Sequence, residues 1–161
     1  MTRNQSGFTV IELLMTVAIL AVLVSLAAPS MKAFMDTQSI KTPATDLYTS
    51  LVLARSEAIK RNSAVDLVPT DVTDWSQGWQ VKVQSAGTVI RVQDPMPAVA
   101  ILPSNVGNLT YGGNGRLVTT AALFRVTIPT NLNLRMRCVS VDASGRPNVR
   151  IDSNTDQTTC D

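Results

Sequence analysis

The chain has 161 residues, a net charge of +2 and no histidine, so the commonest general acid–base residue and metal ligand is missing. Its two cysteines, Cys138 and Cys160, lie far apart in the sequence, and no zinc site, iron–sulfur site or other cofactor is predicted. Aromatic residues make up only 4% of the chain, which argues against a protein that stacks single-stranded nucleic acid on aromatic side chains. Without a nucleophile motif or clustered carboxylates, an enzyme is not expected, and no catalytic or metal-binding residues are assigned.

The N-terminal part of the sequence carries one long apolar run. Over residues 8–28 the only charged residue is Glu12. As a helix this run would be roughly 31 Å long, at about 1.5 Å per residue, which is enough to cross the hydrocarbon core of a bilayer. Arg3 precedes the run, so the N-terminus is expected to stay cytoplasmic and the remainder to be exported. The alternatives are a plain membrane anchor and a secretory signal peptide, for which "SLAAPS" could serve as the cleavage site.

The start of the apolar run has a specific pattern: Gly7, Phe8 and Thr9 are followed by Glu12 and Leu13. This pattern resembles the class III signal of type IV pilins and type II secretion pseudopilins. The resemblance implies cleavage after Gly7 by a prepilin peptidase and N-methylation of Phe8, with the apolar segment retained. It also makes Glu12 an assembly residue, whose expected partner in the low-dielectric filament is the Phe8 ammonium of a neighbouring subunit. The alternative is that Glu12 interacts only with the helix macrodipole.

The next segment has the apolar spacing of a helix. Apolar residues recur three and four positions apart, with charged and polar residues between them. We predict one long helix from about Thr9 to about Arg61, with Pro29 and Pro43 as weak points. Its second half is expected to pack on a globular head; two unrelated helices are the alternative. The apolar stripe consists of Ile40, Ala44, Leu47, Leu51, Ala54 and Ala58.

The remainder of the sequence is typical of an antiparallel β-sheet head. Short β-branched segments such as "AVDLVP", "GWQVKVQ", "TVIRVQ", "LFRVTIP" and "NVRI" are separated by Gly, Pro, Asn and Asp. The predicted fold class is therefore α+β, with a long N-terminal helix, half transmembrane and half amphipathic, packed on this head.

Four head segments follow in a characteristic order: "ARSEAIKRN" at 54–62, "WSQGWQV" at 75–81, "YGGNGRL" at 111–117 and "SGRPNVR" at 144–150. Together with the N-terminal motif they resemble the GspH/FimT/FimU family of minor pilins and pseudopilins. The resemblance implies a type IV pilin-like fold. The implied partners are other major and minor pilins, the prepilin peptidase and, before assembly, the inner membrane.

The same resemblance implies how the chain is divided and where it is located. The subunit would cross the inner membrane once, with a periplasmic head, and would then enter a filament at the cell surface. The implied regions are a prepilin leader (1–7), a transmembrane and filament-core helix (8–29), an amphipathic helix packed on the head (30–62) and the β-rich head with a disulfide-closed tail (63–161).

Positive charge is concentrated in the C-terminal half. Residues 75–150 contain eight basic residues and two acidic ones, and seven of the eight are arginine, which suits bidentate phosphate binding. In extended strands Arg135 and Arg137 would share one face, as would Arg146, Asn148 and Arg150. A hairpin at "DASG" would bring these two ladders side by side. The candidate DNA-binding residues are Arg116, Arg135, Arg137, Arg146, Asn148 and Arg150.

The two cysteines are expected to form a disulfide, because the head is exported. A Cys138–Cys160 bond would contribute roughly 3 kcal/mol on the chain-entropy account. It would pin the polar tail "DSNTDQTT" and fix the loop that carries Arg146 and Arg150. The alternative is a staple that has only a structural role.

The end of the head sharpens the functional prediction. FimT-type minor pilins carry a C-terminal Gly-Arg-x-Arg motif implicated in DNA binding; Gly145 and Arg146 match its first half, Asn148 replaces the second arginine, and Arg150 follows. The predicted function is a minor pilin of a type IV pilus that binds double-stranded DNA non-specifically during natural transformation. The alternatives are a FimU-like assembly primer without DNA binding and a GspH-like pseudopilin of type II secretion. The arginines could then form only a solvated surface or salt bridges to neighbouring pilins.

Overall fold

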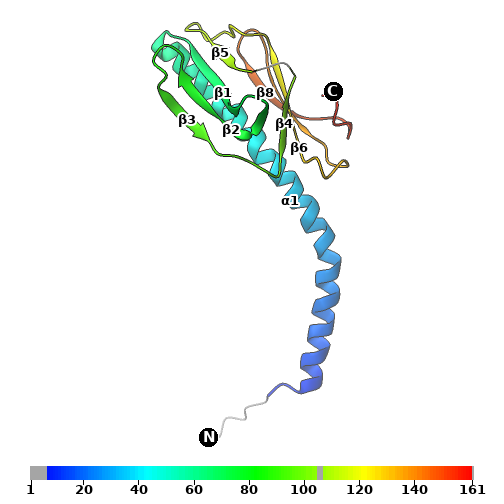
Figure 1. Ribbon diagram of the computed structural model, residues 1–161. Coiled ribbons are helices and arrows are strands. Elements are labelled where there is room, and N and C mark those ends of the chain that lie inside the picture. Colours follow the sequence, from blue (N-terminus) through cyan, green and yellow to red (C-terminus); the bar gives the residue numbers. More distant parts are fainter. Residues whose placement is uncertain (1–6, 105–106, 161) are drawn as a thin grey trace, which may run out of the picture. The chain divides into compact units, whose positions relative to one another are not determined.

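The computed structural model describes residues 7–104 and 107–160, so most of the predicted leader lies outside the described residues. It divides after residue 35 into two compact units. Helix α1 (Val10–Arg61) is followed by a succession of strands (Figure 1). These are β1 (Val65–Asp71), β2 (Asp74–Val83), β3 (Val89–Gln93), β4 (Ala100–Pro103), β5 (Leu109–Tyr111), β6 (Ala122–Thr127), β7 (Arg137–Val141) and β8 (Pro147–Ile151).

Helix α1 begins and ends at recognisable caps. Thr9 precedes its first residue, and the helix continues through both Pro29 and Pro43. At its end Asn62 adopts a left-handed backbone conformation, with φ of 47°. The Ser63 N–H then bonds the Ala58 carbonyl at 3.2 Å, which is the pattern of a Schellman motif. The predicted single helix is therefore confirmed, with its end at Arg61.

The first unit contains the apolar part of the helix. Glu12 is the only charged residue in Val10–Ala27, and this stretch is long and apolar enough to cross a membrane. Its large side chains are more than half exposed within this single chain. A large exposed apolar surface of this kind marks a site of contact with lipid or with protein.

The second unit is built on the predicted apolar stripe of the helix. All six stripe residues, from Ile40 to Ala58, are at most 1% exposed and pack with the strands into one core. Two antiparallel sheets contribute to this core, in the orders β3-β2-β1-β5 and β4-β6-β7-β8. Trp75 of β2 contacts Phe124 of β6 edge-to-face at 4.8 Å between ring centroids, which joins the two sheets. The predicted α+β class and antiparallel head are confirmed.

The hairpin predicted at "DASG" is present and connects β7 to β8. In this hairpin Cys138 opposes Arg150, and Val141 opposes Pro147. Strands β4 and β5 were not expected from the sequence, because with four and three residues they are too short to show a periodic pattern.

Candidate functional site

The N-terminal motif forms a capping box at the start of α1. The backbone N–H and hydroxyl of Thr9 both donate to Glu12 Oε2, at 2.8 and 2.9 Å, and the Glu12 N–H donates to Thr9 Oγ1 at 3.3 Å. This reciprocal arrangement satisfies two of the free donors at the helix N-terminus. The spacing that resembles a processing signal therefore also starts the helix.

The bond predicted to be cleaved lies on an uncovered stretch of the chain. Gly7 precedes the helix, and no described atom lies within 4 Å of the position a Cβ would take there. Phe8 is 93% exposed. Within the described residues nothing covers this peptide bond. Residues 1–6 of the leader lie outside the described residues.

In the head, two turns distant in sequence lie against each other. We call residues 112–116 the glycine turn and residues 142–146 the hairpin turn. Gly145 has φ of +79°, and a Cβ at this position would collide with the Gly115 carbonyl and lie 3.3 Å from the Arg116 Cα. Only glycine fits here, because a side chain would meet both backbone strain and a neighbouring backbone.

Arg55 of α1 holds both turns. Its Nε donates to the Gly115 carbonyl at 3.0 Å, and its Nη2 donates to the Ser144 carbonyl at 3.4 Å. Arg55 is partly buried. A guanidinium is planar and has several N–H donors, so it can bond the carbonyl groups of both turns at once. Tyr111, next to the glycine turn, is fully buried, and this burial raises the pKa of its hydroxyl.

Asp142 closes the hairpin turn from within. Its Oδ1 accepts hydrogen bonds from the Ser144 hydroxyl at 2.6 Å and from the Arg146 N–H at 3.0 Å. These bonds, the Ser144 hydroxyl first, lower the pKa of the Asp142 carboxyl. Arg116 and Arg146 project from the two joined turns, and both are exposed. Asn148 follows on β8 and is also exposed.

The predicted ladder of Arg135 and Arg137 is wrong, whereas Asn148 and Arg150 of the second predicted ladder do share one face of β8. Strand β7 begins only at Arg137, so Arg135 lies in the preceding loop, where it is exposed. Arg137 opposes Ile151, whereas Arg150 opposes Cys138. Because side chains alternate along a strand, Arg137 lies on the core side of the sheet, and Arg150 lies on the other side. A strand boundary that differs by one or two residues decides which face an arginine occupies.

The face that carries Arg150 also carries an arginine absent from the predicted set. Arg125 of β6 opposes Cys138 of β7, which in turn opposes Arg150 of β8. Directly opposed residues share a face, so these three side chains form a row across the outer surface of the sheet. The alternation in "LFRVT" could have revealed this, since Phe124 and Val126 are both fully buried and Arg125 between them is not.

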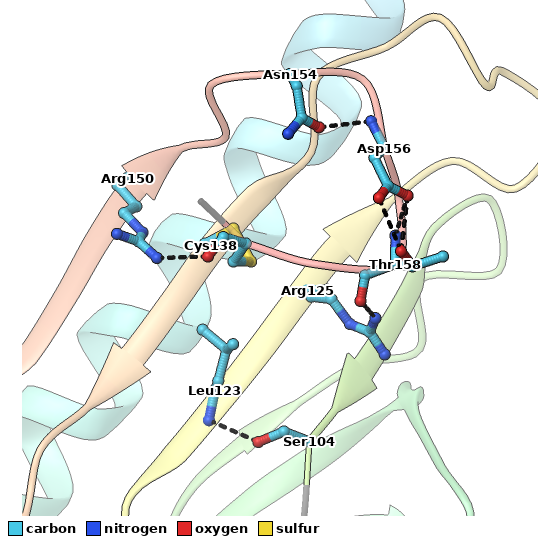
Figure 2. The surroundings of a disulfide bond; sticks show 9 residues. Ser104, Leu123, Arg125, Cys138, Arg150, Asn154, Asp156 and Thr158 are labelled. Carbon is cyan, nitrogen blue, oxygen red and sulfur yellow. Dashed lines mark hydrogen bonds between the residues drawn. A yellow bond between two sulfur atoms is a disulfide. The ribbon is translucent and has the colours of Figure 1, made fainter.

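The C-terminal tail crosses this row. We call residues 152–160 the strap. The predicted Cys138–Cys160 disulfide is present, with Cα atoms 6.2 Å apart. Arg125 donates to the Thr158 carbonyl, and Arg150 Nη2 donates to the Cys160 carbonyl at 2.8 Å. Figure 2 shows these two contacts on either side of the disulfide. The arginines of the row are therefore occupied by the strap, unlike Arg116 and Arg146.

Comparison with known proteins gives two sequence matches. Residues 44–145 match the family described as Type II transport protein GspH, and residues 2–28 match the prokaryotic N-terminal methylation motif. A search of curated proteins gives no significant match.

Solved structures with the same fold are pilin-like subunits. Two crystal structures of the type IV minor pilin FimU from Pseudomonas aeruginosa are 22% and 23% identical, with TM-scores of 0.64 and 0.61. They cover 76% and 71% of this chain, and 98% of FimU in each case. The minor pseudopilin EpsH from the Type 2 Secretion System of Vibrio cholerae is 14% identical, with a TM-score of 0.54, covering 70% of this chain and 95% of EpsH.

The family match extends over more than half of the chain, and the N-terminal methylation motif precedes it. The solved relatives, a minor pilin and a minor pseudopilin, share the helix-and-sheet fold. The chain therefore belongs to the GspH family of minor pilins and pseudopilins.

Proposed function

We propose that this chain is a minor pilin that binds the backbone of duplex DNA through Arg116 and Arg146. The observation that carries the proposal is the junction of the two turns. Gly145 packs on Gly115, and Arg55 bonds a carbonyl of each turn, so two exposed arginines from distant parts of the chain are held at one place. Guanidinium groups bind phosphate with two parallel N–H donors, and holding them in advance lowers the entropy lost on binding.

The predicted binding mode is electrostatic and independent of base sequence. Phosphate contacts fix a protein on the duplex without reading bases. Two arginine–phosphate contacts correspond to a slope of roughly −1.8 in log K against log salt. The exposed Asn148 lies two residues beyond Arg146 and would add a neutral hydrogen bond without changing that slope.

Binding of the full chain in a non-ionic detergent to a fluorescent duplex tests the proposal. Titrations at several salt concentrations should give the expected slope, and Arg116→Gln/Arg146→Gln should remove most of it. The matched control is Lys41→Gln/Lys60→Gln, which removes two exposed positive charges from α1. The absence of binding at low salt would refute the proposal, as would equal binding by the arginine and lysine variants.

Processing and assembly are the second part of the proposed function. The prepilin peptidase would cleave after Gly7, and the new N-terminus at Phe8 would be methylated. The apolar stretch would span the inner membrane with the head in the periplasm, and would then enter the core of a filament. Glu12 would there bind the Phe8 ammonium of a neighbouring subunit, an interaction that a dry environment strengthens. The exposed apolar helix and the accessible Gly7–Phe8 bond support this proposal.

A ligand-free role is the second candidate. The fold likeness to FimU and EpsH favours a subunit that only contributes to assembly, in a pilus or in a type II secretion system. In that case the arginine turns would contact other subunits. The duplex titration separates the two candidates, because a purely structural subunit would show no difference between the arginine and lysine variants.

A further inference from the structure

We infer that the outer face of the β4-β6-β7-β8 sheet is a second polyanion-binding surface, which the strap covers as a competitor within the same chain. This inference rests on the proposed binding of DNA. It assigns Arg125 and Arg150 to the covered surface and leaves Arg116 and Arg146 as the surface that is always open. The strap then sets how many phosphates one head can bind.

The geometry of the row supports this assignment. Arg125 and Arg150 lie on strands β6 and β8, separated by the strand that carries Cys138. Their backbones are therefore about 10 Å apart, two inter-strand spacings. Each guanidinium donates to a backbone carbonyl of the strap, at Thr158 and at Cys160. Carbonyl oxygens here occupy positions that phosphate oxygens of a nucleic acid could take, because both are hydrogen-bond acceptors for guanidinium.

The strap has the charge expected of such a competitor. The strap contains two aspartates, Asp152 and Asp156, and no basic residue. Hydrogen bonds from Thr158 are the main cause of the lowered pKa of the Asp156 carboxyl, and the charge of Arg125 lowers it further. An acidic segment lies on basic side chains, so strap and DNA would compete for the same charges.

The strap is held on the sheet by side-chain and backbone contacts and not by strand pairing. It contains no strand, and most of its residues are exposed. Besides the disulfide and the two arginines, the Asp152 N–H bonds the Met136 carbonyl at 3.0 Å, and Gln157 Nε2 bonds the Asn131 carbonyl at 3.0 Å. The disulfide ties the end of the strap to β7, so the strap stays at a high local concentration next to Arg125 and Arg150.

Opening the strap is a two-electron reduction. A thiolate of a dithiol reductant attacks the Cys160 sulfur, and Cys138 leaves as a thiolate that takes up a proton. The second thiol of the reductant then displaces Cys160 and forms the reductant's own disulfide. Cys160 is partly exposed and Cys138 is fully buried, so Cys160 is the accessible sulfur. The product has two thiols and a free acidic tail.

The test compares duplex binding by the oxidised and reduced full chain in detergent. Two additional phosphate contacts make the salt slope more negative by roughly 1.8, so raising salt from about 50 to about 200 mM should weaken the reduced protein about 12-fold more than the oxidised one. In Arg125→Gln/Arg150→Gln this increment between the oxidised and the reduced protein should disappear. Near-ultraviolet circular dichroism of the buried Trp75 and Trp79 verifies that the reduced head is folded.

A second pair of variants keeps the disulfide and covers the case in which reduction disturbs the fold. Asp156→Asn weakens the strap, and Asp94→Asn removes the same charge at another exposed position. A larger increase in duplex affinity for Asp156→Asn than for Asp94→Asn supports the inference, and equal increases for the two variants contradict it. Equal binding by oxidised and reduced protein contradicts the inference that the strap competes with DNA, but leaves the proposed function standing. Absence of binding in both states overturns the proposed function as well, so the two failures are distinguishable.

Discussion

The N-terminal motif and the arginine turns show two different ways of building a candidate functional site. In the motif, Thr9 and Glu12 are three residues apart, and their hydrogen bonds are those of a helix start. In the turns, Arg116 and Arg146 are brought together by Gly145 and by Arg55, from three distant parts of the chain. The first site needs only the contacts within one helical turn, whereas the second needs the contacts of the folded head.

The largest expected effect tests the local site. We expect Glu12→Val to be cleaved normally but to enter filaments at least an order of magnitude less than the wild type. The physical reason is that the subunit loses the charge that would pair with the Phe8 ammonium in a low-dielectric filament core. Immunoblots of sheared filaments and of total cell protein would measure incorporation and processing separately.

Glu12→Gln is the matched control, because glutamine can still complete a capping box but carries no charge. If the charge is what matters, this variant fails to assemble just as Glu12→Val does. Wild-type incorporation of Glu12→Gln would instead assign the residue to helix capping alone.

An intermediate effect tests the site made by tertiary contacts. Gly145→Ala should lower the free energy of unfolding by about 1–3 kcal/mol from backbone strain, with an additional cost because the new methyl collides with the Gly115 carbonyl. Gly87→Ala is the control, since Gly87 also has a positive φ, +64°, but no neighbour within 4 Å. Denaturant titration of the full chain would compare them. Equal losses of stability would mean that the contact between the turns is not tight.

The smallest effect concerns the charge that closes the hairpin turn. The chemical shift of the Arg146 amide proton should change as the Asp142 carboxyl is protonated, with a midpoint below the ordinary pKa range of aspartate. The Ser144 hydroxyl and the Arg146 N–H lower this pKa because both donate hydrogen bonds to the ionised carboxylate. The turn is thus stabilised above that pH and loses this stabilisation as the pH falls through the lowered pKa. Ser144→Ala should raise the midpoint, as followed by amide chemical shifts. An unshifted midpoint in the wild type would argue against the turn geometry.

Much of the fold was predictable because it depends on local patterns. The spacing of the apolar stripe predicted the helix and its buried face, and "DASG" predicted the β7–β8 hairpin. The cysteine pair was also predictable, because an exported head with two cysteines favours a disulfide.

The arrangement of the arginines was not predictable from the same patterns. Arg137 was assigned to the wrong face because the start of β7 sets the phase of alternation, and the sequence does not mark that start. Arg55 belongs to the helix by its pattern, and nothing in its spacing indicates that its guanidinium reaches two turns. The occupation of Arg125 by the strap likewise depends on where the tail folds back.

The contacts of Arg55 also bear on the order of folding. Its two acceptors lie 60 and 89 residues further along the chain. Contacts of such long sequence separation carry a large loop-closure entropy, so we expect them to form after the hairpins and the helix. An incompletely folded head would then have most of its core but no ordered arginine pair.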